Sequence, residues 1–126
     1  MAQHDIPFQV IDWLGIEQIE HKGQRGSAFW KTLQYPGLRI RIVTYSAGYI
    51  ADHWCQKGHI VHCLDGELIT EHENGGMYVL KEGMTYVVSD DLSSHRSVAA
   101  KEVKLLIIDG DFLMPHHHPQ TNAVPQ

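Results

Sequence analysis

The chain has 126 residues, 43% of them hydrophobic and 20% charged, which is typical of a single soluble globular domain. Its formal net charge of −5 argues against a nucleic-acid partner, because phosphate binding usually needs a basic surface. No apolar run approaches the roughly 18 residues of a membrane span. The first residues also lack the basic start and apolar stretch of a secretory signal. We therefore expect a cytoplasmic protein with no nucleic-acid or membrane partner.

The first third of the chain predicts a strap followed by strands. Apolar residues scattered over residues 1–14 indicate a short strand or a strap that packs on the domain. Turn signals at Lys22–Gly26 and Pro36-Gly37 bound two predicted strands, over residues 16–21 and 28–34. Apolar and polar residues then alternate over residues 38–45, which predicts a further strand.

The rest of the chain continues as short β-branched segments separated by Gly and Asp turns. The predicted strands cover residues 60–64, 67–71, 77–80, 84–88 and 103–108, and Asp65-Gly66 joins the first two in a hairpin. From Met114 onward Pro and polar residues dominate, so we expect one domain over residues 1–112 and a disordered tail over 113–126. About eight to ten short strands of this kind predict an all-β jelly-roll barrel or sandwich.

A cluster of imidazole and thiol side chains lies between these apolar segments. His53 and Cys55 are two residues apart, so in an extended strand both would project to the same face. His59 follows the break at Lys57-Gly58 and can approach the same point from the next strand. His and Cys are preferred ligands of transition metals, so the pattern predicts a metal site inside a β-barrel.

The spacing of this cluster resembles the first cupin motif, which has the pattern Gly, five residues, His-x-His, three or four residues, Glu, six residues, Gly. Here Gly48 is followed by four residues and then His53-x-Cys55. His59 comes after three more residues, and Gly66 after a further six. Cys55 therefore replaces the second His of the motif, and His59 replaces its Glu.

The second cupin motif is matched less closely. It has the pattern Gly, five residues, Pro-x-Gly, two residues, His, three residues, Asn. Gly83 fits its first position, His95 comes one residue late, and Ala99 stands in the place of the Asn. The resemblance covers about residues 35–110, and the cluster at residues 52–55 is similar to that of the DHCW-motif cupin fold proteins.

The resemblance implies a small single-domain cupin, with a jelly-roll barrel also described as a double-stranded β-helix. It implies a homodimer and a divalent transition metal held by His53, Cys55, His59 and His95. Replacing the carboxylate ligand by a thiolate softens the set toward Zn, Fe or Cu, and Ni and Mn stay open as well. Cys55 could equally be a buried core thiol.

Three functions stay open at this stage. The first is a metal-dependent enzyme acting on a small molecule, such as a dioxygenase, isomerase or lyase. The second is a non-enzymatic module that binds or senses a small ligand, and the third is a metal-free structural cupin. No catalytic residue is assigned.

Other residues are candidates for the walls of the barrel. Trp30, Tyr45 and Tyr86 are expected to line a cavity, and Cys63 alternates with His59 so that it also faces the interior. Arg39 and Arg41 alternate on one strand face, where they bind an anionic ligand or lie on a solvated surface. The run His116-His117-His118 is expected to bind metal only adventitiously.

Overall fold

The structure is a computed structural model that describes residues 5–114, so nearly all of the predicted tail lies outside the described residues. None of the helices in this part of the chain is long and apolar enough to span a membrane. The elements are η1 (Trp13–Gly15), β1 (Gln18–Lys22), β2 (Ser27–Tyr35), β3 (Leu38–Tyr45), β4 (Tyr49–Ile50), β5 (His59–Asp65), β6 (Glu67–His72), β7 (Met77–Lys81), β8 (Thr85–Val88), β9 (His95–Ala99), β10 (Val103–Gly110) and η2 (Asp111–Leu113).

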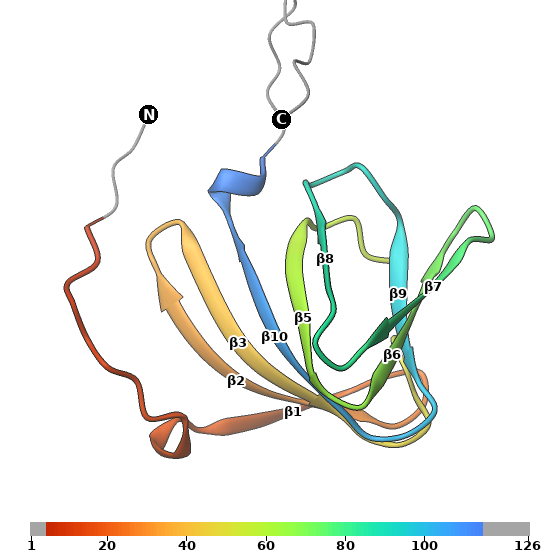
Figure 1. The fold of residues 1–126 in the computed structure, drawn as a ribbon, viewed down its shortest axis with the longest axis horizontal. Coiled ribbons are helices and arrows are strands. Elements are labelled where there is room, and N and C mark those ends of the chain that lie inside the picture. The colour runs from red at the N-terminus through yellow and green to blue at the C-terminus, as the bar shows by residue number, and fades with distance from the viewer. Residues whose placement is uncertain (1–4, 115–126) are drawn as a thin grey trace, which may run out of the picture.

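The strands form two antiparallel sheets that face each other (Figure 1). One sheet has six strands in the order β1-β2-β3-β10-β5-β8, and the other has four in the order β4-β9-β6-β7. In Figure 1 the two sheets come together at the lower end of the view and diverge toward the upper end. The prediction of an all-β protein is therefore confirmed.

Alternation along β3 and β10 builds one inner wall. Val43 and Tyr45 on β3 are buried, as are Val103, Leu105 and Ile107 on β10. Side chains two residues apart share a face of a strand. Arg41 therefore lies on the same face of β3 as Val43, and Asp109 on the same face of β10 as Ile107. Arg41 is 5% exposed and Asp109 is 2% exposed, which places a guanidinium and a carboxylate inside the barrel. Arg41 therefore does not lie on a solvated sheet face.

Two strands were not predicted from the sequence, β4 and β9. Arg96 and Ser97 interrupt apolar alternation in β9, so its own residues give little strand signal. The strand forms because its backbone pairs with β6 on one side and with β4 on the other. This pairing joins residues far apart in the sequence, and it fixes the position of His95 opposite His72.

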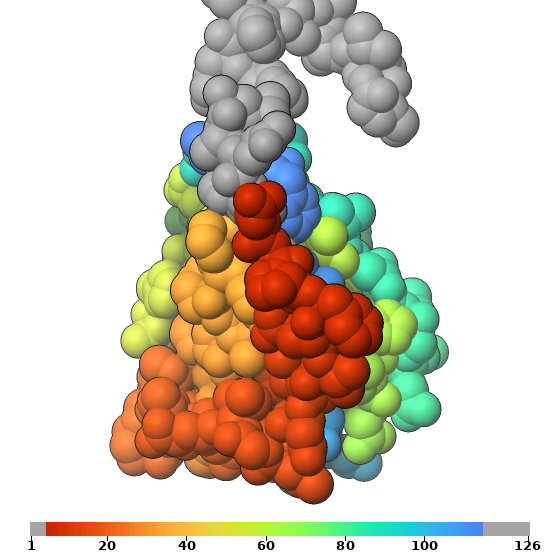
Figure 2. Space-filling model, turned by 90° about the vertical axis from the view of Figure 1, so that its left-hand side faces the viewer, coloured from red at the N-terminus to blue at the C-terminus, as the bar shows by residue number. Residues whose placement is uncertain are grey.

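The N-terminal segment is a strap and not a strand. Residues 5–12 form no regular element, and they lead into η1. Figure 2 shows this segment, in red, lying over the face of the molecule formed by β2 and β3. Lys31 Nζ donates a hydrogen bond to the Trp13 carbonyl at 3.0 Å, and the Tyr35 hydroxyl donates to Gln9 Oε1 at 2.8 Å. These two contacts tie the strap to β2.

Candidate metal centre

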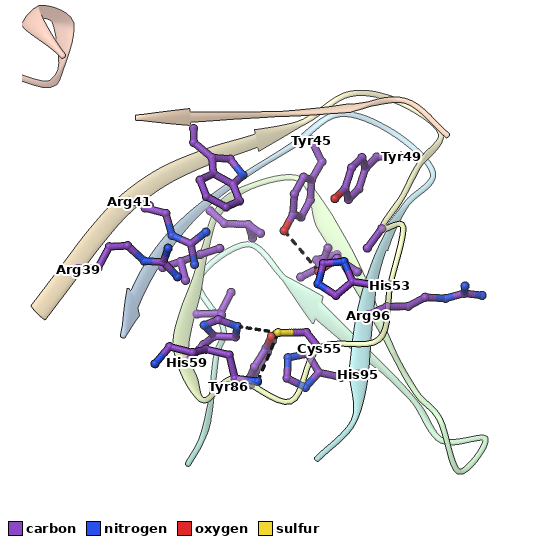
Figure 3. Close-up of a pocket in the computed structure, with 18 residues that line it drawn as sticks. Arg39, Arg41, Tyr45, Tyr49, His53, Cys55, His59, Tyr86, His95 and Arg96 are labelled. Carbon is purple, nitrogen blue, oxygen red and sulfur yellow. Dashed lines mark hydrogen bonds between the residues drawn. The ribbon is translucent and has the colours of Figure 1, made fainter. Parts of the chain in front are cut away.

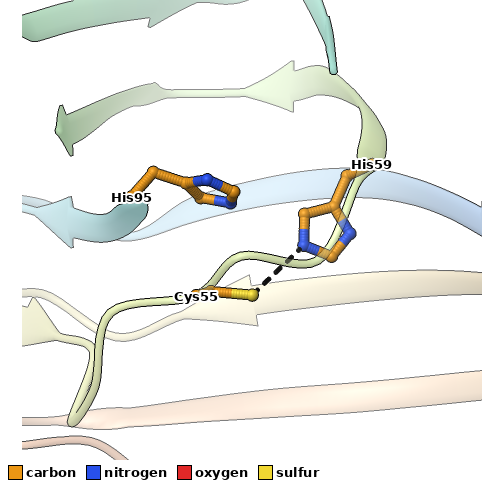
Figure 4. Close-up of side chains that lie close together, drawn as sticks. All are labelled: Cys55, His59 and His95. Atoms are coloured by element: carbon orange, nitrogen blue, oxygen red, sulfur yellow. Dashed lines mark hydrogen bonds between the residues drawn. The ribbon is translucent and has the colours of Figure 1, made fainter. Parts of the chain in front are cut away.

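Three of the four predicted metal ligands come together. Cys55, His59 and His95 each offer one ligand atom, and these atoms all lie within 4.8 Å of one another (Figure 4). His59 begins β5 in the six-stranded sheet, His95 begins β9 in the four-stranded sheet, and Cys55 lies on the loop between β4 and β5. The cluster therefore bridges the two sheets.

Backbone pairing holds Cys55 against His95. The Cys55 N–H donates to the His95 carbonyl at 2.7 Å, and the His95 N–H donates to the Cys55 carbonyl at 2.9 Å. The chain then turns, and the Lys57 N–H donates to Cys55 Sγ at 3.4 Å. These bonds fix the thiol beside an imidazole that comes from another part of the sequence.

His53 lines the same cavity but lies apart from the three-residue cluster. Its side chain is 71% exposed, and its Nδ1 lies 2.7 Å from Asp52 Oδ1. The expected strand across His53 and Cys55 does not form, because residues 51–58 are a loop in which Cys55 makes one isolated β-bridge. The rule that residues two apart share a face holds only in extended strands, so it does not bring His53 to the cluster.

The two clustered histidines each use one ring nitrogen for a partner outside the cluster. His59 Nδ1 lies 3.1 Å from Asp109 Oδ2, and His95 Nδ1 lies 2.8 Å from Ser93 Oγ. The Nε2 atom of each ring is left for the cluster. Histidines that bind metals usually donate the other ring N–H to such a partner, which fixes the orientation of the ring.

The donor atoms fit a transition metal. His59 Nε2 lies 3.8 Å from Cys55 Sγ, close to the roughly 3.6 Å that separates N and S ligands around a tetrahedral ion with ordinary bond lengths. His95 Nε2 is buried and has no hydrogen-bond partner among the described residues. A buried polar atom without a partner is costly, and a metal ion at the centre of the cluster would supply one.

The electrostatics of the cluster favour the thiolate form of Cys55. Burial on its own raises the pKa of the Cys55 thiol, but the neighbouring His59 and His95 side chains and the hydrogen bond from the Lys57 N–H outweigh it and lower that pKa to about 5. Burial lowers the pKa of His59, whereas its contacts with Asp109 and Cys55 raise it by more, so the net shift is upward. Cys55 is therefore a thiolate at neutral pH, the form in which cysteine binds metals.

The cluster forms part of the lining of a cavity of about 270 Å³ (Figure 3). Trp30, Tyr45 and Tyr86, which were expected to line the barrel, do line this cavity. Cys63 faces the interior, as its alternation with His59 predicts, and it is fully buried. It is not among the lining residues, and its Sγ donates to the Gly66 carbonyl at 3.4 Å. The thiol of Cys63 thus belongs to the core and not to the site.

Two residues that orient the site were not found from the sequence, Asp109 and Ser93. Asp109 continues the alternating stripe of Leu105 and Ile107 on β10, so the period of that strand already placed it inside the barrel. Ser93 gave no comparable signal, because it lies on the loop before β9 and meets His95 through a local turn.

Gly58 controls how closely the Cys55 loop approaches β8. A Cβ atom at this position would lie 2.6 Å from backbone atoms of Val88, Ser89 and Asp90, and the Gly58 N–H donates to Asp90 Oδ1 at 2.6 Å. We expect Gly58→Ala to lower the free energy of unfolding by about 1–3 kcal/mol, because backbone atoms cannot make room for the methyl group. Urea denaturation measures this change.

The control for Gly58 is Gly15→Ala, because a Cβ at Gly15 meets nothing within 4 Å. We expect this variant to unfold at the urea concentration of the unmodified protein, within about 0.5 kcal/mol. Equal stability of Gly58→Ala and Gly15→Ala would contradict the tight approach at Gly58.

Comparison with known proteins identifies the fold. No protein-family model matches the sequence, and no curated protein is similar to it. Among solved structures, the chain is similar to an ectoine synthase from P. lautus, with 17% identity, a TM-score of 0.66, and coverage of 94% of this chain and 100% of the other.

Two further structures show the same fold. The first is a sugar phosphate isomerase of a cupin superfamily from the organism Silicibacter pomeroyi, with 14% identity and a TM-score of 0.66. The match covers 81% of this chain and 75% of the other. The second is Fe(II)-HppE with an alternative substrate, with 15% identity, a TM-score of 0.67, and coverage of 85% and 63%. The two facing antiparallel sheets are thus those of the cupin fold.

Proposed function

We propose that this chain of cupin fold is a metal-binding protein in which Cys55, His59 and His95 hold one divalent transition metal, and that a small molecule binds or reacts there. The observation that carries the proposal is the meeting of the three ligand atoms within 4.8 Å at the wall of a cavity. A thiolate with two imidazoles suits Zn, Fe, Cu or Ni better than Mn.

A set of three protein ligands leaves a coordination position open for a water or a substrate. Three protein ligands are typical of catalytic metal sites, where a further position stays open for water or substrate, whereas structural zinc sites usually have four protein ligands. A metal in such a site supplies Lewis acidity and lowers the pKa of a bound water. The role of Asp109 and Ser93 is to hold His59 and His95 with Nε2 directed at the centre.

Similarity to solved structures carries the fold but not the reaction. The three neighbours described above are a synthase, an isomerase and a protein containing Fe(II), so one fold serves several chemistries. A non-enzymatic binding module remains the second candidate, since the same open cavity serves both functions.

Elemental analysis tests the proposal. The full chain is purified without metal-affinity resin and with His116, His117 and His118 changed to Gln, because that run would otherwise retain added metal. We expect about one metal ion per chain in this protein, and less than about a tenth of that in Cys55→Ser, His59→Ala and His95→Ala.

The control is His62→Ala. His62 lies on β5 close to His59, but it is half-buried outside the cluster and its Nδ1 lies 2.8 Å from Thr85 Oγ1. We expect this variant to keep its metal. If the three ligand variants retained as much metal as His62→Ala, the proposed site would be wrong.

The homodimer implied by the family resemblance stays a prediction. Three apolar side chains of the strap region are 84–94% exposed, namely Phe8, Val10 and Leu14. Burial of such side chains against a second copy would be favourable. Light scattering of the full chain measures the oligomeric state.

A further inference from the structure

The cavity beside the metal centre has cationic walls. Four cationic side chains line it, namely Arg39, Arg41, Lys57 and Arg96. No Asp or Glu is among the described residues that line it. This contrasts with the net charge of −5 on the whole chain. Lys57 and Arg96 have partners at the rim, Asp90 at 3.7 Å and Glu71 at 2.9 Å. The positive charge without a rim partner therefore lies with the other two arginines, where it attracts anions, and the Cys55 thiolate at the metal centre is the opposing charge on the same lining.

Arg41 is buried with unused hydrogen-bond donors. It is 5% exposed, and its Nη2 donates to Asp109 Oδ2 at 3.1 Å. Its Nε is buried and has no partner among residues 5–114. Burial and the neighbouring Arg39 lower the pKa of this guanidinium, whereas Asp109 raises it. A guanidinium has five N–H donors, and a buried donor without a partner costs free energy. An acceptor that enters from the cavity and pairs with Arg41 would remove this cost.

The charge balance around Asp109 leaves one positive charge over. Arg39 Nε and Nη2 donate to the two Asp109 oxygens at 3.0 Å each, and Arg41 shares one of these oxygens. Two guanidinium groups thus face one carboxylate. The Arg41 guanidinium also lies 4.4 Å from the centre of the Trp30 ring, which holds its plane in place. One surplus charge on a planar, fixed guanidinium suits a carboxylate, which it can bind through two parallel hydrogen bonds.

The arginines and the metal centre are close enough to share one small ligand. Asp109 Oδ2 lies 3.1 Å from Arg41 Nη2 and 3.1 Å from His59 Nδ1, so a single oxygen joins them. Figure 3 shows Arg39 and Arg41 together at one side of the cavity and His59 between them and Cys55. The cavity volume of about 270 Å³ is below the roughly 300–1,000 Å³ of sites for drug-sized ligands, so the ligand is small.

Two phenols add neutral donors to the wall. Burial raises the pKa of Tyr45 and of Tyr86, so both hydroxyls stay protonated at neutral pH. Both residues line the cavity. The Tyr45 hydroxyl donates to Ser97 Oγ at 3.5 Å, and a neutral hydroxyl that turns toward an anion can donate to it without adding a repulsive charge.

We propose that the cavity binds a small organic monocarboxylate, with its carboxylate on Arg41 beside Arg39 and its remaining polar group directed at Cys55, His59 and His95. The position of the remaining polar group rests on the proposed function, because that group would reach the metal. Binding of the carboxylate depends only on the arginines and can be tested without metal.

Calorimetric titration of the full chain, on the background in which His116, His117 and His118 are Gln, tests the inference. The probes are glycolate, lactate and pyruvate, each compared with its uncharged amide, and inorganic phosphate. Each is titrated into metal-free protein and into cobalt-loaded protein. We expect at least one carboxylate to bind about 10–100-fold more tightly than its amide in both forms, the usual effect of charge-assisted hydrogen bonds. The unmodified protein alone decides this comparison, whether or not any variant folds.

Variants separate the carboxylate site from the metal site. Arg41→Lys keeps a cation but loses the planar fork, and we expect it to weaken carboxylate binding about tenfold with unchanged cobalt content. Cys55→Ser should lose cobalt and still prefer the carboxylate over the amide. Lys81→Gln removes an exposed cation on β7 and should bind as the unmodified protein does.

Three results would overturn the inference. They are equal binding of every acid and its amide, tighter binding of phosphate than of any carboxylate, and equal weakening by Lys81→Gln and Arg41→Lys. Loss of cobalt binding in the unmodified protein, with the carboxylate preference intact, would instead reject the metal centre and leave the anion site standing.

Discussion

Asp109→Asn is expected to lower the free energy of unfolding by about 3–5 kcal/mol, the cost of breaking a buried ion pair from one side. The carboxylate is 2% exposed and accepts hydrogen bonds from Arg39 and Arg41, and it lies 3.1 Å from His59 Nδ1. Asparagine keeps the shape and removes the charge, so Arg41 stays buried without a counter-ion. Urea denaturation of metal-free protein measures the change, which is a large part of the roughly 5–15 kcal/mol that stabilises a typical domain.

The control for this prediction is Glu71→Gln. Glu71 pairs with Arg96 at 2.9 Å, but both side chains are 28% exposed. Pairs exposed to solvent contribute roughly 0–1 kcal/mol, so this variant should lose much less stability. A loss for Asp109→Asn no larger than that for Glu71→Gln would show that the Asp109 network contributes little to folding.

The effect of Asp109 should also depend on pH. Burial raises the pKa of Asp109, but His59 and the two arginines lower it by more, so its pKa in the folded protein lies below the ordinary value. A lowered pKa gives stability that is fully present well above the unfolded-state value of about 3.9 and is lost as the pH falls below it. The difference between the unmodified protein and Asp109→Asn should therefore narrow below about pH 4. A difference that widened there would contradict this assignment.

Zinc is expected to stabilise the protein by about 4 kcal/mol when its free concentration exceeds the dissociation constant about 1,000-fold. The three ligand atoms are assembled only in the folded chain, because Cys55, His59 and His95 come from a loop and two different sheets. A metal that binds the folded state preferentially raises its stability. Chemical denaturation with and without zinc measures the gain, on the background in which His116, His117 and His118 are Gln.

Cys55→Ser should abolish most of this gain, because it removes the thiolate. The matched control, His62→Ala, should keep the full gain, since that side chain lies outside the cluster and is bonded to Thr85. Undiminished stabilisation of Cys55→Ser by zinc would exclude the thiolate as a ligand.

The zinc effect should weaken in mild acid. His59 binds a metal only when its Nε2 is free of a proton, and the net shift of its pKa is upward from the ordinary value, through Asp109 and Cys55. As the pH falls through that raised value, protons compete with zinc and the gain in stability shrinks. The Cys55 thiol, with a pKa of about 5, competes for protons only at lower pH. Measurements between about pH 8 and pH 5 would reveal this order.

Several features of the fold followed directly from local sequence. Alternation over residues 38–45 predicted β3, and the Asp65-Gly66 turn predicted the hairpin of β5 and β6. Alternation along β5 also predicted that Cys63 faces the interior. These features are predictable because strand period and turn chemistry act between residues close together in the chain.

Other features depended on distant residues. β9 forms through pairing with β6 and β4, although its own residues alternate poorly. His53 is mostly exposed because residues 51–58 form a loop and not a strand. The path of this loop is set by the backbone hydrogen bonds between Cys55 and His95. Neither the pairing nor the loop path is encoded in a local pattern.

The sequence by itself determined the all-β class, the faces of its clearest strands, and the types of side chain available to bind a metal. Only the tertiary structure decided which of these side chains meet. It joined Cys55 to His95 through two backbone hydrogen bonds, and it placed Asp109 between His59 and the arginines. The physical reason is that a site between two sheets is set by pairing and packing across the chain, which strand period cannot specify.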